Sequence, residues 1–235
     1  MTVDKPAVTI RPMTRRTSSS RKPRRPGSAK GPGHRGTDRR TPGRLRLIGG
    51  DFRRRQLPVL DHPGLRPTPD RVRETLFNWL TAAVPGARVL DLFAGTGALG
   101  LEALSRGARE AVFVEADARV ARQLADNLVT LEASERATLR TTEAQAFLAG
   151  PAAPFSLVFL DPPFHRGLAA ECCAALEAGG WLDEAAWIYL ETESSLTPDV
   201  PAAWQPHREV RAGDSTGRLY RRRPDDGQSP DGDGC

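Results

Sequence analysis

The chain has 235 residues, of which 39% are hydrophobic and 6% aromatic, and this length is sufficient for one domain with a core. It contains neither an apolar stretch of the roughly 18 residues that a membrane span needs nor the apolar core of a secretory signal, so we expect a cytoplasmic protein without a membrane partner. Its cysteines, Cys172, Cys173 and Cys235, have neither the spacing of a disulfide framework nor that of a metal site, and no metal is expected.

The net charge of +5 is unevenly distributed. Residues 1–44 contain 13 of the 34 Lys and Arg residues but only two of the 29 acidic residues. Residues 1–43 are rich in Arg, Pro, Ser and Gly, and this predicts a disordered basic tail, with a second, acidic disordered tail at 224–235. Clustered cations attract the phosphates of RNA, but a merely solubilising extension fits equally well. The many prolines and glycines disfavour an organelle transit peptide.

Residues 44–84 predict a hairpin followed by a helix. Apolar and polar residues alternate through 45–59 on either side of Gly49-Gly50-Asp51, as in a pair of antiparallel strands. A rigid segment with two prolines at 66–70 then leads into a helix over 70–80. The apolar face of this helix comprises Val72, Leu76, Trp79 and Leu80.

Residues 85–223 alternate between strand and helix patterns, which predicts a doubly wound α/β domain with a mostly parallel sheet. The expected strands lie at 87–93, 111–117, 137–142, 155–161 and 185–193, and the expected helices at 97–107, 118–133, 143–150 and 168–180. Two further strands on either side of Gly213-Asp214 predict a hairpin that adds an antiparallel strand at the edge of the sheet.

The stretch VLDLFAGTGALG at 89–100 predicts a strand, a tight turn and a helix that together hold a ligand. Its glycines at 95, 97 and 100 form a G-x-G-x-x-G pattern, which lets a ligand approach the backbone closely. Asp91 ends the strand, and Glu115 follows the next strand about 20 residues after the first glycine, where such folds hold ribose hydroxyls. A dinucleotide and S-adenosylmethionine both fit this pattern.

The strand at 155–160 ends in the loop Asp161-Pro162-Pro163-Phe164, which favours a methyltransferase. An exocyclic amine of a nucleobase is a poor nucleophile because its lone pair is delocalised into the ring. The Asp161 carboxylate and the Pro162 carbonyl are suited to hold such an amine, and Phe164 offers a face for stacking. A dehydrogenase is disfavoured because only His165 lies near a strand end. The alternative is a structural turn in which Phe164 covers the core.

Four segments in this order resemble the RsmD family, the bacterial small-subunit ribosomal RNA guanine-N2 methyltransferases: IGGDFRRRQLPV, GLRPTPDRVRETLFNWL, DLFAGTGALGLEALSRGA and DPPF. The similarity spans about residues 45–223. It implies the class I, Rossmann-like methyltransferase fold, S-adenosylmethionine as methyl donor and the N2 amine of one guanine in 16S ribosomal RNA as acceptor.

The resemblance also implies roles for individual residues. Asp91, Gly95 and Gly97 line the methionine part of the donor, Glu115 its ribose, and Glu143 with Ala144 its adenine. Arg66 and Thr68 cover the donor, and Asp161 to Phe164 form the catalytic loop. The predicted donor site comprises Asp91, Phe93, Ala94, Gly95, Thr96, Gly97, Glu115, Ala116, Glu143, Ala144, Arg66 and Thr68. Arg71 and Arg73 are candidates for RNA or donor contact, although Arg73 fits an ion pair on a solvated helix face equally well.

The expected partner is small-subunit ribosomal RNA in a pre-ribosomal particle or a 30S subunit, and the enzyme is expected to be a monomer. A methyltransferase for DNA adenine or protein glutamine remains an alternative, because such enzymes share the (D/N)-P-P-aromatic loop. A nicotinamide-dependent oxidoreductase and a non-catalytic RNA-binding module are alternatives of other classes.

Overall fold

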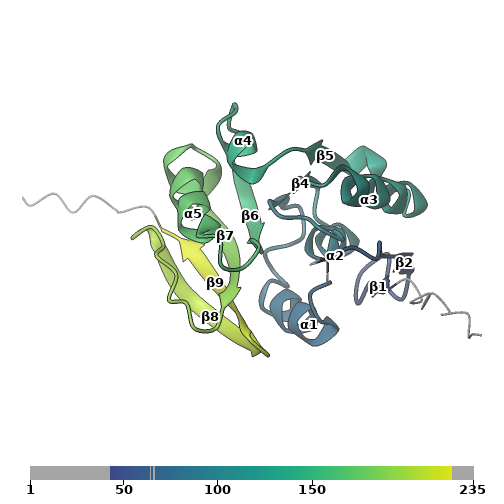
Figure 1. Cartoon of the computed structure of the whole chain (residues 1–235), viewed down its shortest axis with the longest axis horizontal. Coiled ribbons are helices and arrows are strands. Elements are labelled where there is room, and N and C mark those ends of the chain that lie inside the picture. The colour runs from purple at the N-terminus through teal and green to yellow at the C-terminus, as the bar shows by residue number, and fades with distance from the viewer. Residues whose placement is uncertain (1–42, 64, 66, 224–235) are drawn as a thin grey trace, which may run out of the picture. The chain divides into compact units, whose positions relative to one another are not determined.

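The computed structural model describes residues 43–63, 65 and 67–223. Almost all of the predicted basic tail, the whole predicted acidic tail and Arg66 therefore lie outside the described residues. The elements, labelled in Figure 1, are β1 (Arg44–Arg46), β2 (Gln56–Pro58), α1 (Asp70–Trp79), β3 (Arg88–Asp91), α2 (Ala98–Ser105), β4 (Glu110–Glu115), α3 (Ala118–Thr130), η1 (Ser134–Arg136), β5 (Ala137–Thr141), α4 (Ala144–Leu148), β6 (Phe155–Leu160), α5 (Leu168–Ala178), β7 (Leu182–Glu193), β8 (Trp204–Ala212) and β9 (Ser215–Arg222).

Seven strands form one sheet in the order β5-β4-β3-β6-β7-β9-β8, and β1 and β2 form a separate pair. The five strands β5, β4, β3, β6 and β7 are parallel to one another, whereas β9 is antiparallel to both β7 and β8. The predicted mostly parallel sheet with an antiparallel edge is therefore confirmed. Because β4 and β6 flank β3 on opposite sides, the chain reverses its winding direction at the end of β3, where such sheets bind ligands.

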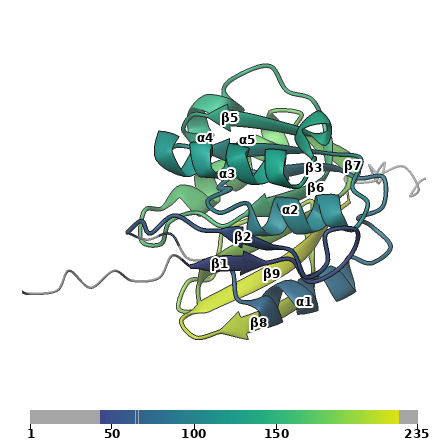
Figure 2. The same ribbon diagram turned by 90° about the vertical axis from the view of Figure 1, so that its right-hand side faces the viewer.

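The sheet is buried on both faces. Successive residues of a strand point to opposite faces, so Val89 packs in one core cluster and Leu90 in the other. Helices α1, α2 and α3 and the β1–β2 pair cover one face, and α4 and α5 cover the other, as Figure 2 shows. This double covering explains why the central strands read as nearly continuous apolar runs.

The predicted hairpin and first helix are present and share the core of the sheet. Leu45 pairs with Leu57 across β1 and β2, and both side chains are buried. In α1 the predicted residues Val72 and Leu76 are buried, while Trp79 is half-buried against the same core. Phe77, which the predicted apolar face omitted, is fully buried with its ring centroid 5.9 Å from that of Phe159.

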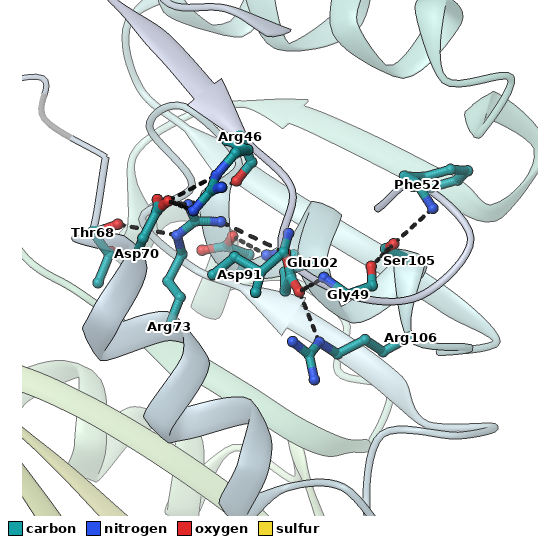
Figure 3. A network of polar contacts seen from close by, with 12 residues as sticks. Arg46, Gly49, Phe52, Thr68, Asp70, Arg73, Asp91, Glu102, Ser105 and Arg106 are labelled. Carbon is teal, nitrogen blue, oxygen red and sulfur yellow. Dashed lines mark hydrogen bonds and ion pairs between the residues drawn. The ribbon is translucent and has the colours of Figure 1, made fainter. Parts of the chain in front are cut away.

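A buried carboxylate attaches the turn of the hairpin to α2 (Figure 3). Glu102 is fully buried and accepts hydrogen bonds of 2.8 Å from the backbone N–H groups of Ile48 and Gly49. Its Oε1 also accepts a 2.7 Å bond from Arg106 Nε. One turn further along α2, the Ser105 hydroxyl accepts a 2.9 Å bond from the backbone N–H of Phe52. The hairpin is thus held to the helix that follows the glycine turn.

Arg73 belongs to the same network. It forms an ion pair within its helix, with Asp70, but neither on a solvated face nor in contact with RNA or donor. Its side chain is fully buried rather than solvated or facing RNA or donor. Nε donates to the Thr68 carbonyl at 3.0 Å, and Nη2 donates to the Arg46 carbonyl at 2.8 Å and to Asp70 Oδ1 at 2.6 Å. Its Nη1 lies 3.6 Å from Glu102 Oε2. Arg73 therefore links the hairpin, the start of α1 and α2.

Candidate active site

The glycine turn lies between the end of β3 and the start of α2. Gly95 and Gly97 have φ values of +50° and +76°, in the region that side chains other than glycine rarely adopt. A Cβ atom on Gly100 would lie 2.2 Å from the ring of Phe113, so only glycine allows this approach of α2 to β4. The glycine pattern thus has two structural reasons, the tight turn that the sequence predicted and the close packing of helix on strand.

Two carboxylates fix this turn from the ends of neighbouring strands. Asp91 Oδ2 accepts a 2.9 Å bond from the backbone N–H of Gly100. Glu115, at the end of β4, accepts 2.9 Å and 2.8 Å bonds from the backbone N–H groups of Gly95 and Asp117, one on each carboxylate oxygen. Each of these oxygens keeps a second lone pair that can accept a bond from a ligand hydroxyl.

The predicted donor residues and the catalytic loop border one cavity of about 270 Å³ at the carboxyl ends of β3, β4 and β6. Twelve of the predicted site residues line it: Thr68, Asp91, Phe93, Ala94, Gly95, Thr96, Glu115, Ala116, Glu143, Ala144, Asp161 and Pro163. Gly97, Pro162 and Phe164 do not line this cavity, although Gly97 shapes its turn. Leu65 and Arg166 are among the lining residues that were not predicted. Leu65 lies in the segment GLRPTPDRVRETLFNWL but has no polar group, and Arg166 lies beyond the DPPF motif.

The Asp-Pro-Pro-Phe loop also borders a second cavity of about 400 Å³. Pro162 and Phe164 lie on this side, opposite the end of β7 and the following segment 194–199. Pro163, Arg166 and Leu168 line both cavities, so the loop is the wall between them. The Phe164 side chain is 37% exposed, and it is not a cover for the core.

Burial of the acidic groups at this wall raises their pKa values. Burial raises the pKa of Asp91 to about 7; the bond from Gly100 opposes this effect, and the charge of Glu115 adds to it. The pKa of Asp161 lies well above its ordinary value because of burial first, and then the negative charges of Glu191 and Asp91. Among the described residues no donor or cation contacts the Asp161 carboxylate. A cation bound here would stabilise the ionised forms of both carboxyls.

The acidic residues at the end of β7 were not among the predicted site residues. Glu191 accepts a 3.0 Å bond from the Tyr189 hydroxyl, and Glu193 accepts one from the backbone N–H of His165. Glu191 and Glu193 both line the second cavity. The contact of Glu193 with His165 spans 28 residues of chain, and local sequence patterns do not reveal such a contact. The two acidic residues at the end of a buried strand were nevertheless visible in the sequence.

A family model described as Conserved hypothetical protein 95 matches residues 45–221. Ribosomal RNA small subunit methyltransferase D of Escherichia coli (strain K12) is 52% identical over 194 residues, which cover 82% of this chain and 95% of the relative. The protein of the same name from Haemophilus influenzae is 46% identical over 182 residues, covering 76% of this chain and 94% of that one. The chain belongs to this family of ribosomal RNA methyltransferases. The resemblance to the RsmD family seen in the sequence is therefore confirmed.

Solved structures agree with this assignment. The Escherichia coli protein yhhF has a TM-score of 0.72 and 49% identity, covering 77% of this chain and 99% of that chain. An RNA methyltransferase from Salinibacter ruber, solved in complex with S-adenosyl-L-homocysteine, shares the fold with a TM-score of 0.53 at 16% identity, covering 71% of this chain and all of that one. The predicted class I, S-adenosylmethionine-dependent methyltransferase fold is confirmed.

Within the described residues, no group of three His, Cys, Asp or Glu side chains is arranged to hold a metal ion. No helix in this part of the chain is long and apolar enough to cross a membrane.

Proposed function

We propose that the protein transfers a methyl group from S-adenosylmethionine to the exocyclic N2 amine of one guanine in small-subunit (16S) ribosomal RNA. The observation that carries the proposal is the position of the Asp-Pro-Pro-Phe loop between two cavities, of which the first is also lined by the glycine turn and Glu115. Donor and acceptor bound in these cavities would meet at Asp161. The identity to relatives named small subunit methyltransferase D supports the choice of RNA.

The first cavity fits the donor in its chemistry. The donor carries a positive sulfonium, and the carboxyls of Asp91 and Asp161 on the cavity wall are short of positive charge among the described residues. Glu115 offers lone pairs to the ribose hydroxyls, while Glu143 and Ala144 lie at the start of α4, where the adenine is expected. Thr68 lies over the opening, and its carbonyl is held by Arg73.

The second cavity fits a single base. Phe164 and Leu196 are two of the exposed large apolar side chains, and both line it. A base that stacks on the Phe164 ring gains about 1–3 kcal/mol. The N2 amine of a paired guanine is hidden in the minor groove, so the base must come from a loop or be flipped out of its helix to enter this cavity.

S-adenosylmethionine supplies an activated methyl group bonded to positive sulfur. The chain's own residues orient the acceptor: the Asp161 carboxylate and the Pro162 carbonyl accept hydrogen bonds from the amine and direct its lone pair toward the methyl carbon. As the nitrogen–carbon bond forms and the carbon–sulfur bond breaks, positive charge grows on nitrogen next to Asp161. Asp161 stabilises this charge and accepts the released proton, and orientation supplies much of the remaining rate.

We further propose that the substrate is RNA within a pre-ribosomal particle or a 30S subunit, and that the enzyme acts as a cytoplasmic monomer. The basic tail at 1–43 is proposed as an RNA-attracting arm, since its charge suits phosphates rather than a base. The division into this tail, an N-terminal hairpin and helix at 44–84, a methyltransferase domain at 85–223 and an acidic tail at 224–235 is likewise proposed.

The test is to incubate the protein with labelled S-adenosylmethionine and small subunits that lack the modification, and then to map the labelled nucleotide. We expect label on N2 of one guanine. Label on adenine or on protein glutamine, or binding of a nicotinamide dinucleotide in place of S-adenosylmethionine, would contradict the proposal. A parallel reaction with protein-free 16S RNA distinguishes a particle from naked RNA as substrate.

A further inference from the structure

Two acidic residues from the end of β7 line the second cavity together with Pro162, Pro163 and Phe164 of the catalytic loop. Glu191 is engaged within the fold: Oε2 accepts the 3.0 Å bond from the Tyr189 hydroxyl, and Oε1 accepts a 2.7 Å bond from the Ser215 hydroxyl. Its side chain is buried. Glu191 therefore has little capacity left for a ligand.

Glu193 is arranged differently. Its Oε1 accepts a bond from the backbone N–H of His165 and lies 3.1 Å from His165 Nδ1, while no other described residue donates to Oε2. The Glu193 side chain is 14% exposed and lines the second cavity. One oxygen thus holds the catalytic loop, and the other remains available to a bound molecule.

The conformation of His165 fits this description of Glu193. His165 has a φ of +61°, which residues other than glycine rarely adopt, and it follows directly after Phe164. The contact with Glu193 stabilises this conformation. Glu193 therefore fixes the end of the loop and at the same time lines the second cavity beside it.

A free carboxylate oxygen at this place can distinguish guanine from adenine by the group at position N1 of the base. Guanine presents two adjacent donors, N1–H and the N2 amine, whereas adenine has an acceptor at N1. A carboxylate oxygen accepts only, so it attracts the N1–H of guanine and repels an unprotonated N1. Since Asp161 is proposed to hold the amine, a second acceptor suits the neighbouring N1–H.

We propose that Glu193 accepts a hydrogen bond from N1–H of the acceptor base and so selects guanine, which makes it a specificity-determining residue. This inference rests on the proposed function. The carboxylate is ionised at neutral pH, because its surroundings lower the pKa of Glu193. The pKa is lowered by hydrogen bonds from its own backbone N–H and from that of His165 and by the charge of His165, and burial opposes this effect.

The test compares guanine with 2,6-diaminopurine, which keeps the 2-amine but has an acceptor at N1, placed at the mapped nucleotide of reconstituted small subunits. For the wild-type protein we expect kcat/KM to favour guanine by on the order of 10- to 100-fold, the usual size of discrimination by a base-edge contact. In Glu193→Gln the amide can donate to N1, so we expect this preference to shrink by about tenfold or more.

Glu184→Gln is the matched control, because it makes the same chemical change on the same strand at an exposed position outside the second cavity; it should leave the preference unchanged. If Glu193→Gln lowers both rates equally and the preference stays, Glu193 only holds the loop and the proposal is overturned. Near-equal wild-type rates on the two bases overturn it without any variant. Failure of the wild type to methylate guanine at all would instead refute the proposed function.

Discussion

Two regions of this molecule bury carboxylates, and they differ in how many hydrogen-bond donors and cations surround them. Under the hairpin, Glu102 receives two backbone N–H groups and the guanidinium of Arg106, with Arg73 beside it. At the catalytic loop, Asp91 receives one N–H, and no described residue donates to Asp161. A buried carboxylate satisfied by its own chain stabilises a fold, whereas carboxylates that lack positive charge indicate a site where a ligand supplies it.

The largest effect is expected from removing the satisfied carboxylate. In Glu102→Ala the N–H groups of Ile48 and Gly49 lose their acceptor and the buried Arg73 loses a neighbouring negative charge, so we expect the free energy of unfolding to fall by about 3–5 kcal/mol. Urea unfolding measures this loss. Glu110→Ala removes a partly exposed ion pair with Arg88 and should cost only about 0–1 kcal/mol. Equal losses in the two variants would refute the structural role of Glu102.

Removing the unsatisfied carboxylate should affect the reaction instead. Asp161→Ala is expected to lower turnover by on the order of 100- to 1000-fold, because the charge that grows on the acceptor nitrogen loses its partner. Stability should change little or rise, since burial and neighbouring carboxyls already disfavour the ionised form. Single-turnover methylation and urea unfolding measured on one preparation separate the two effects. A variant that binds donor normally and keeps near wild-type turnover would show that Asp161 has a different role.

The smallest effect concerns the basic tail. Deletion of residues 1–43 should weaken RNA binding at physiological salt by on the order of tenfold, because contacts between cations and phosphates are lost. Each lost contact should lower the slope of log affinity against log salt concentration by about 0.7–0.9. Donor affinity should stay the same. Filter binding over a series of salt concentrations gives the slope, and an unchanged slope would restrict the tail to a role in solubility.

Most residues that line the first cavity could be predicted from the sequence, because local patterns and topology suffice for them. Asp91 and Glu115 each end a parallel strand, Asp161 directly follows one, and strand ends in such a sheet meet at one edge. The burial of Arg73 and Glu102 was not predicted, although their positions in the sequence indicated it. Arg73 shares the apolar face with Leu76 and Phe77, and Glu102 is the only charged residue of an otherwise apolar and small helix, so both positions imply buried charge.

The hydrogen-bond partners of buried carboxylates could not be predicted from the sequence. Glu102 bonds to residues more than 50 positions away, and Glu193 reaches a loop 28 positions earlier. Such pairs follow from packing in three dimensions and leave no trace in helix or strand periodicity. The structure was needed to show which carboxylates are satisfied and which are not.

The central claim is that the carboxyls of the first cavity are completed by the positive charge of the donor. Burial raises the pKa of Asp91 to about 7, so in the free protein this carboxyl is partly protonated at neutral pH, and a bound cation favours its ionised form. Binding of S-adenosylmethionine should therefore release protons, and its affinity should rise with pH through about 7 and level off above. Binding of S-adenosylhomocysteine, which lacks the sulfonium charge, should release fewer protons. Calorimetry in buffers of different ionisation enthalpy between pH 6 and 8 counts these protons. The predicted result is that S-adenosylmethionine releases more protons on binding than S-adenosylhomocysteine. Absence of any binding heat with both compounds, or absence of proton release with both, would contradict the claim.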